Sequence, residues 1–90
     1  MAEDSVTIDT RTIDDNVDQR QVEFEGDVSG TRYPFAVQYD VLEALSTKVP
    51  DSDAVALFHQ HADAIATLGV TALARDPDQE MIVISENDLD

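Results

Sequence analysis

Two runs of alternating apolar and polar residues, joined at Ser29-Gly30, form the clearest pattern in the chain. Alternation with a period of two is typical of strands that bury one face. A Ser-Gly pair suits a two-residue turn, so residues 21–38 are predicted to form a β-hairpin. Pairing Val28 with Thr31 sorts the side chains onto two faces. The apolar face then pairs Gly26 with Tyr33, Phe24 with Phe35 and Val22 with Val37, and the polar face pairs Asp27 with Arg32, Glu25 with Pro34, Glu23 with Ala36 and Gln21 with Gln38.

Further strands are predicted on either side of this hairpin. Residues 6–9 alternate more weakly, and a polar loop is expected at residues 13–19. Residues 81–84 are wholly apolar, which is typical of a central strand buried on both faces. Pro34 cannot donate a ladder hydrogen bond, so we expect an edge or a bulge of the second hairpin strand near it.

Two helices are predicted between the hairpin and the last strand. Asp40 followed by Glu43 resembles a capping box and predicts a short helix that ends near Thr47. From residue 53 to residue 75 the apolar positions recur at helical spacing. Gly69 lies on the apolar side of this second helix, where its missing side chain allows close approach to a sheet.

The order β-β-β-α-α-β predicts an α+β fold, a small antiparallel sheet with two helices packed on one face. Ninety residues suffice for one modest core, so residues 1–90 are expected to form a single domain. We expect residues 1–4 and 86–90 at its ends to be disordered.

The charge balance narrows the function classes. Twenty acidic residues against five basic ones give a net charge of −15, which disfavours direct binding to nucleic acid or to an anionic membrane. Fourteen of the acids are aspartates and Lys48 is the one lysine, a composition that resembles proteins of salt-loving archaea. An ordinary acidic protein is the alternative. Cysteine is absent, and no leader or membrane-spanning run is visible, so a cytoplasmic protein is expected.

Residues 57–65, LFHQHADAI, place two histidines and an aspartate at alternate positions, as in some metal and hydrolase sites. Successive helical residues rotate by about 100°, so His61 lies about 40° from Ile65 on the apolar side. His59 and Asp63 lie about 120° and 160° from Ile65, on the solvent side. One helix cannot gather all three around a metal ion, and we expect no metal or catalytic residue here.

The polar stretch before the hairpin resembles an EF-hand calcium loop. Its positions one, three, five and twelve are occupied by Asp14, Asn16, Asp18 and Glu25. Gln19 stands where that loop requires glycine, and the flanking segments are not helices. We therefore expect no calcium site, and the chain has no glycine-rich phosphate loop or nucleophilic serine elbow that would indicate another cofactor or reaction.

From residue 20 to residue 90 the chain resembles a group of small uncharacterised bacterial and archaeal proteins known as a domain of unknown function. The resemblance rests on VEFEG, SGTRYPFAV, YDVLEAL, LFHQHADAI and MIVISENDL. It implies an α+β domain with an antiparallel sheet and helices on one face. It implies no catalytic or ligand residue.

The residues sort into core, turn and solvated surface, so we expect a small non-catalytic domain that binds or regulates another protein, with no cofactor. The alternative is an acidic nucleic-acid mimic that occupies a basic protein groove with carboxylates such as Glu23, Glu25 and Asp27. A third hypothesis is an enzyme or metal protein that uses the two histidines. A mimic needs carboxylates in one dense stripe, whereas salt adaptation spreads them over the whole surface.

The charge also predicts that folding depends on salt. Uncompensated carboxylates repel one another, and the screening length falls from about 10 Å at 0.1 M salt to about 3 Å at 1 M. Because the net stability of a small domain is only ~5 kcal/mol, this repulsion can erase it. We expect little order in dilute buffer and cooperative folding in molar KCl, followed by circular dichroism. The same melting temperature in dilute and molar KCl would contradict salt adaptation.

Overall fold

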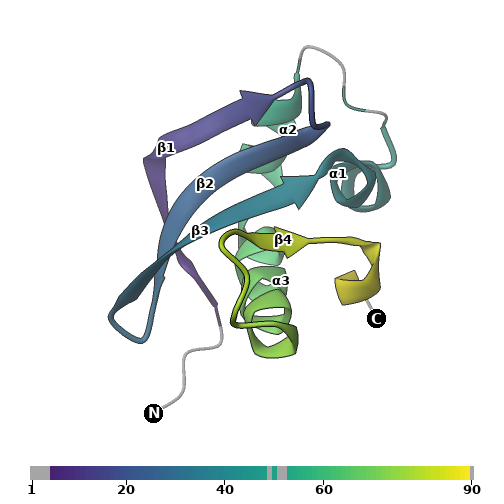
Figure 1. Cartoon of the computed structure of the whole chain (residues 1–90). Helices are drawn as coiled ribbons and strands as arrows, with labels where there is room; N and C mark the ends of the chain where they lie inside the picture. The colour runs from purple at the N-terminus through teal and green to yellow at the C-terminus, as the bar shows by residue number, and fades with distance from the viewer. Residues whose placement is uncertain (1–4, 49, 51–52, 90) are drawn as a thin grey trace.

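A computed structural model of the chain describes residues 5–48, 50 and 53–89. Its elements are β1 (Thr7–Asn16), β2 (Gln21–Val28), β3 (Thr31–Gln38), α1 (Tyr39–Ser46), α2 (Ala54–Gln60), α3 (Ala62–Arg75), β4 (Ile82–Ile84) and the 3-10 helix η1 (Glu86–Leu89). The strands form one sheet in the order β1-β2-β3-β4, and α2 and α3 lie on one face of it (Figure 1). The predicted α+β class is confirmed.

The hairpin of β2 and β3 has the predicted register, from Val28 opposite Thr31 to Gln21 opposite Gln38. Ser29 and Gly30 both have positive φ, 52° and 84°, as a tight two-residue turn requires. The rings of Phe24 and Phe35 stack with their centroids 5.3 Å apart. Alternation and turn chemistry therefore sufficed to fix this part of the sheet.

The core lies between the inner face of the sheet and helices α2 and α3. Phe58 of α2 packs edge-on against Phe24, with ring centroids 5.0 Å apart. The largest fully buried side chains are Phe35, Phe58, Leu42, Ile65, Ile82, Ile84, Val22, Val37 and Val41. Burying each such side chain contributes about 1.5–3 kcal/mol relative to leaving it exposed. One core thus holds together elements from β2 to β4.

The sheet is mixed rather than antiparallel, and β4 is an edge strand rather than a central one. Phe35 pairs with Ile82 and Val37 with Ile84 in parallel orientation. The three helices carry the chain back before it enters the sheet, so β4 runs in the same direction as β3. Pro34 pairs with Glu25 of β2, but on its other side β4 provides no partner, because the pairing of β3 with β4 starts one residue later, at Phe35. The edge expected near Pro34 is therefore on the side of β4. The apolar run at the C-terminal end reflects packing under α3, not a central position.

β1 is longer than predicted. The expected loop at residues 13–19 shrinks to a turn, because residues 14–16 pair with the start of β2. A register shift between Asp9 and Asp14 marks a bulge in β1. The bulge interrupts the alternation on which the prediction depended.

The first helix starts earlier than predicted, and its expected cap is wrong. α1 begins at Tyr39, Gln38 occupies the N-cap position, and no side-chain cap hydrogen bond forms. Asp40 lies in the first turn of the helix, where a negative charge is favourable without capping. The helix ends as predicted at Thr47, which has a left-handed φ of 62°.

The predicted helix over residues 53–75 is two helices that meet at His61. The His61 backbone has φ −119° and ψ 22°, outside the helical region. Its N–H is shared between the carbonyl oxygens of Leu57 and Phe58, at 3.1 and 3.2 Å, which ends α2. Its own carbonyl accepts the N–H of Ile65 at 3.0 Å in α3. The helical spacing continues across the junction and so gave no sign of the break.

The C-terminal segment differs from the disordered tail that the sequence predicts. Residues 86–89 form η1, and the Asp88 side chain is 1% exposed. Asp88 forms an ion pair with Arg75 at 3.1 Å and accepts the Ser85 N–H at 3.0 Å. Arg75 also donates to the Val83 carbonyl at 3.0 Å, at the outer edge of β4. Residues 1–4 and 90 lie outside the described residues.

Val6 occupies the space left by two glycines, one in the sheet and one in α3. A Cβ at Gly26 would lie 2.3 Å from Cγ1 of Val6, and a Cβ at Gly69 would lie 2.7 Å from its Cγ2. The Val6 N–H donates to the Ala66 carbonyl of α3 at 3.0 Å. The close approach of helix and sheet that was predicted at Gly69 is confirmed, with Phe35 as the next neighbour.

Replacing Gly69 with alanine is expected to cost ~1–3 kcal/mol through overpacking against Val6. In a Val6→Ala background the clash disappears, and Gly69→Ala is expected to be neutral or to stabilise by up to about 1 kcal/mol through helix propensity. Gly26→Ala should be rescued less, because its Cβ would also lie 3.1 Å from the Thr7 carbonyl oxygen. Denaturant unfolding in molar KCl of Val6→Ala, and of each glycine variant with and without Val6→Ala, measures this coupling. An equal cost of Gly69→Ala in both backgrounds would contradict it.

Candidate interaction surface

The two histidines and Asp63 do not form a site. His59 is exposed on α2, His61 is half-buried at the junction, and Asp63 is exposed in the first turn of α3. His61 is thus less accessible than His59, as predicted. Within the ranges that the structure describes, no three His, Asp or Glu side chains could hold a metal ion.

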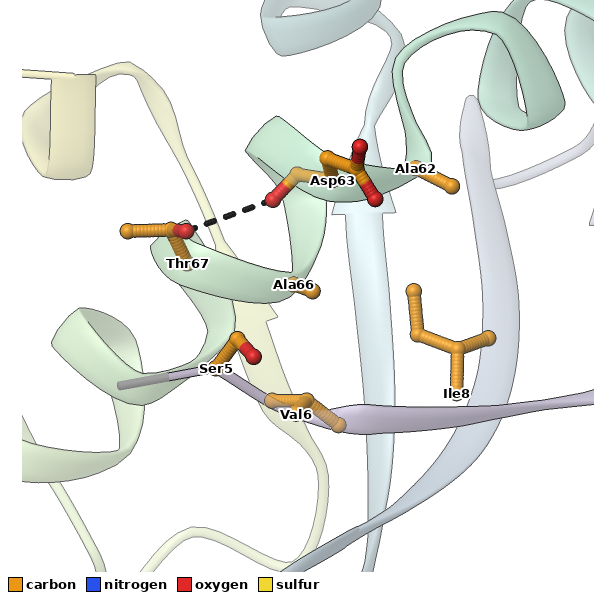
Figure 2. Close-up of a pocket in the computed structure, with 7 residues that line it drawn as sticks. All are labelled: Ser5, Val6, Ile8, Ala62, Asp63, Ala66 and Thr67. Carbon is orange, nitrogen blue, oxygen red and sulfur yellow. Dashed lines mark hydrogen bonds between the residues drawn. The ribbon is translucent and has the colours of Figure 1, made fainter. Parts of the chain in front are cut away.

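A hollow of about 350 Å³ lies between the start of β1 and the first turns of α3 (Figure 2). Its lining residues are Ser5, Val6, Ile8, Ala62, Asp63, Ala66 and Thr67. The Thr67 hydroxyl donates to the Asp63 backbone carbonyl at 3.2 Å. The polar side chains of this lining are the carboxylate of Asp63 and the hydroxyls of Ser5 and Thr67, and no basic residue is among the seven.

The residues of the EF-hand-like pattern are used inside the β1–β2 hairpin. The Asn16 side-chain oxygen accepts the Gln19 N–H at 3.2 Å in the turn. Asp14 pairs with Glu23 across the two strands, and Glu25 binds Arg32. Asp14, Asn16 and Glu25 therefore lie on two paired strands rather than in one loop.

The polar residues instead gather on one face of the sheet, the outer face, as the strand registers show. Helices α2 and α3 lie on the other face (Figure 1). Alternation along the paired strands defines this outer face. It comprises Thr7, Asp9, Asp14 and Asn16 of β1, Gln21, Glu23, Glu25 and Asp27 of β2, Arg32, Pro34, Ala36 and Gln38 of β3, Met81 just before β4 and Val83 of β4, with Arg11 and Thr12 added by the bulge.

Asp9 is the centre of an ion-pair cluster on the outer face. Its Oδ1 accepts from Nε of Arg11 at 3.0 Å, and its Oδ2 accepts from Nη2 of Arg32 at 2.6 Å. Arg32 Nε reaches Oε1 of Glu25 at 2.7 Å. These hydrogen bonds, first with Arg11 and then with Arg32, hold the pKa of Asp9 well below its usual range. The cluster joins β1, β2 and β3 at the bulge.

Thr12 repairs the ladder where the bulge breaks it. Its hydroxyl donates to the Asp9 carbonyl at 2.7 Å and accepts the Glu25 N–H at 2.8 Å. A side chain thus replaces the backbone partners that the extra residues of β1 displace.

Glu23 is a carboxylate held in place without a cation. Its Oε2 accepts from the side-chain amides of Asn16 at 2.7 Å and Gln21 at 2.9 Å. These bonds lower the pKa of Glu23, with Asn16 as the larger cause. Gln21 also contacts the sulfur of Met81 at 3.9 Å, so the two side chains reach each other over β3 and cover Ala36.

A second polar group ties the start of α1 to the β1–β2 turn. The Tyr39 hydroxyl donates to Asp15, and burial, with this bond second, raises the pKa of Tyr39 to about 12. The Arg20 guanidinium lies 5.5 Å from the centre of the Tyr39 ring. The Arg20 carbonyl accepts the Tyr39 N–H at 2.9 Å, which fixes Arg20 in a left-handed conformation with φ 54°.

A solved structure of a protein of unknown function shares this fold. The structure of a protein of unknown function from the DUF1488 family of Shewanella loihica PV-4 matches this chain with a TM-score of 0.70 and 20% identity. The match covers 93% of this chain and 96% of that chain. At 20% identity the match shows the fold alone. The fold is thus shared with a small domain of unknown function, as the sequence resemblance implied.

No family model matches the sequence, and no curated protein matches it either. Among the described helices, none has the length and apolar character to cross a membrane.

Sequence reasoning foresaw the polar side of β2 but missed Asp9, Arg11 and Thr12. The Asp-x-Arg spacing within an alternating run was the available signal, since residues two apart on a strand share a face. No such signal was available for Thr12, because its bond with Glu25 depends on the pairing of β1 with β2 around the bulge.

Asp9→Asn is expected to destabilise the domain, because it weakens the bonds to both arginines. Asp14→Asn, the same charge change on the same strand, should be neutral or stabilising, because it relieves repulsion alone. The pKa of Asp9 is depressed by folding, so its contribution is complete above the unfolded value of about 3.9 and is lost as pH falls through the lower folded value.

Thermal unfolding at pH 7 and pH 3 in molar KCl measures both variants against the parent chain. The deficit of Asp9→Asn should be larger at pH 7 than at pH 3. Equal melting temperatures of the two variants at pH 7 would contradict the role of this cluster.

Proposed function

We propose that the chain is a small non-catalytic domain that binds another protein in concentrated salt. The observation that carries the proposal is the outer face, where polar side chains are fixed by one another rather than converging on a cavity. Within the described residues, every buried side-chain nitrogen or oxygen has a hydrogen-bond partner. A catalytic side chain would be expected to direct its reactive atom into a cleft rather than to hydrogen-bond only with its neighbours on a surface.

The distribution of carboxylates supports salt adaptation. Exposed acids occur on α1, in the segment between α3 and β4 and on η1, as well as on the sheet; outside the sheet they include Asp40, Glu43, Asp76, Asp78, Glu80 and Glu86. Such spreading keeps the whole surface hydrated in salt. The four arginines, by contrast, all contact particular partners, as the ion pairs and the Tyr39 contact illustrate.

The acidic nucleic-acid mimic is the second candidate. Glu23, Glu25 and Asp27 do share one face of β2, with alternate residues about 6.6–6.8 Å apart along the strand. Arg32 neutralises the middle carboxylate of this row at 2.7 Å, which breaks the stripe that a mimic needs. This geometry therefore favours an outer face that binds another protein through carboxylates and other side chains, rather than one that imitates a phosphate backbone.

Affinity capture of the tagged chain from its native cells in molar KCl tests the proposal. An interaction domain should retain a protein that, once purified, binds the chain by calorimetry and that added duplex DNA does not displace. Displacement by DNA would favour the mimic, because both ligands would compete for one basic groove. Absence of any protein that binds on repurification would contradict both candidates.

A further inference from the structure

The outer face carries its acidic residues on β1 and β2. Its apolar residues lie on β3 and next to or on β4, where β3 also contributes Arg32 and Gln38 and where Ala36 is fully buried. The acidic half carries Asp9, Asp14, Glu23, Glu25 and Asp27. The apolar half carries Pro34, Ala36, Met81 and Val83, of which Pro34 is exposed and Met81 and Val83 are half-buried. A two-layer fold buries one face of its sheet under its helices. Here α2 and α3 lie on the inner face, opposite the outer face (Figure 1).

The charges within the acidic half are unevenly balanced. Arg11 and Arg32 neutralise Asp9 and Glu25 through bonds of 2.6–3.0 Å. Asp14, Glu23 and Asp27 have no cation among the residues that the structure describes. The amides of Asn16 and Gln21 orient Glu23 without adding positive charge. Three carboxylates thus remain for positive charges supplied from outside.

The spacing of the two halves suits a helix laid along the strands. Neighbouring strands lie about 4.8 Å apart, so the β2 row and the β4 row are separated by about 10 Å. That separation is close to the diameter of a helix with its side chains, about 10–12 Å. A helix lying over β3 would direct one flank to the carboxylates and the other to the apolar row.

We infer that the outer face is the docking surface of this domain and that its ligand is a basic amphipathic helix of another protein. Its lysines or arginines would pair with Asp14, Glu23 and Asp27, and its apolar side chains would cover Pro34, Met81 and Val83. A second copy of this chain does not fit, because it brings another net charge of −15, and nucleic acid is repelled for the same reason. The inference rests on the proposed function and adds the surface and the partner class.

The probe is a synthetic amphipathic helix of about 18 lysine and leucine residues, which spans the eight-residue strands of the hairpin. Titration into the isotopically labelled chain in about 0.5 M KCl should shift the amide resonances of β1 to β4 and leave those on the exposed sides of α1 and α3 in place. Affinity should fall severalfold at about 2 M KCl, as screening weakens the ion pairs.

Two matched double variants distinguish binding to this face from a general attraction of the peptide to the negative charge of the domain. Glu23→Gln with Asp27→Asn should weaken peptide binding about fivefold, while Glu43→Gln with Asp63→Asn, the same charge change on α1 and α3, should leave it within about twofold. Met81→Ser should weaken it about as much as the first pair. Circular dichroism confirms that each variant is folded before it is titrated.

Equal weakening by the two double variants would overturn the inference, and so would equal binding of an all-lysine peptide or a dimer of the chain that buries this face. Those results would leave the proposed function intact if a captured protein still bound the chain through another surface. Loss of that captured protein in the Glu23→Gln, Asp27→Asn variant, with retention in the control variant, would support both.

Discussion

The contact of Val6 with two glycines sets the distance between the sheet and α3. Neither Gly26 nor Gly69 has room for a Cβ beside the Val6 methyl groups, so the three residues act as one packing unit. The bond from Val6 to the Ala66 carbonyl fixes the start of β1 on the helix. Because α3 lies this close, it covers the core residues of β3 and β4 and leaves the opposite face of the sheet free of helices.

The few cations of the chain serve tertiary links. Arg32 joins β3 to Asp9 of β1, and Arg75 joins the end of α3 to Asp88 of η1. Exposed ion pairs contribute little in isolation, but these connect segments that no backbone ladder joins directly. Other carboxylates of the described surface, such as Asp40, Glu43 and Asp78, are exposed to the solvent. High salt screens the exposed repulsion between carboxylates more effectively than it screens short, hydrogen-bonded pairs, and the proposed adaptation to concentrated salt rests on this difference.

The outer face of the sheet is the docking surface that we propose for this domain. Its polar half is rigid because Thr12, Asn16 and Gln21 satisfy backbone and carboxylate groups locally. A surface that is already ordered loses little conformational entropy on binding. Its apolar half forms because β4 joins β3, which brings together residues that are distant in the sequence.

The sequence by itself determined the hairpin, its register and the close approach at Gly69, because side chains alternate with a fixed period and a two-residue turn allows one pairing. It also placed Glu23, Glu25 and Asp27 on one face. Tertiary structure decided the direction and edge position of β4, since an apolar run reads the same in either orientation. It decided the helix break at His61, where hydrophobic spacing is continuous, and the burial of Asp88, whose partner Arg75 lies thirteen residues away. Tertiary structure also decided that the outer face combines acidic, basic and apolar residues, because the ion pairs of the arginines and the order of the strands depend on contacts between distant residues.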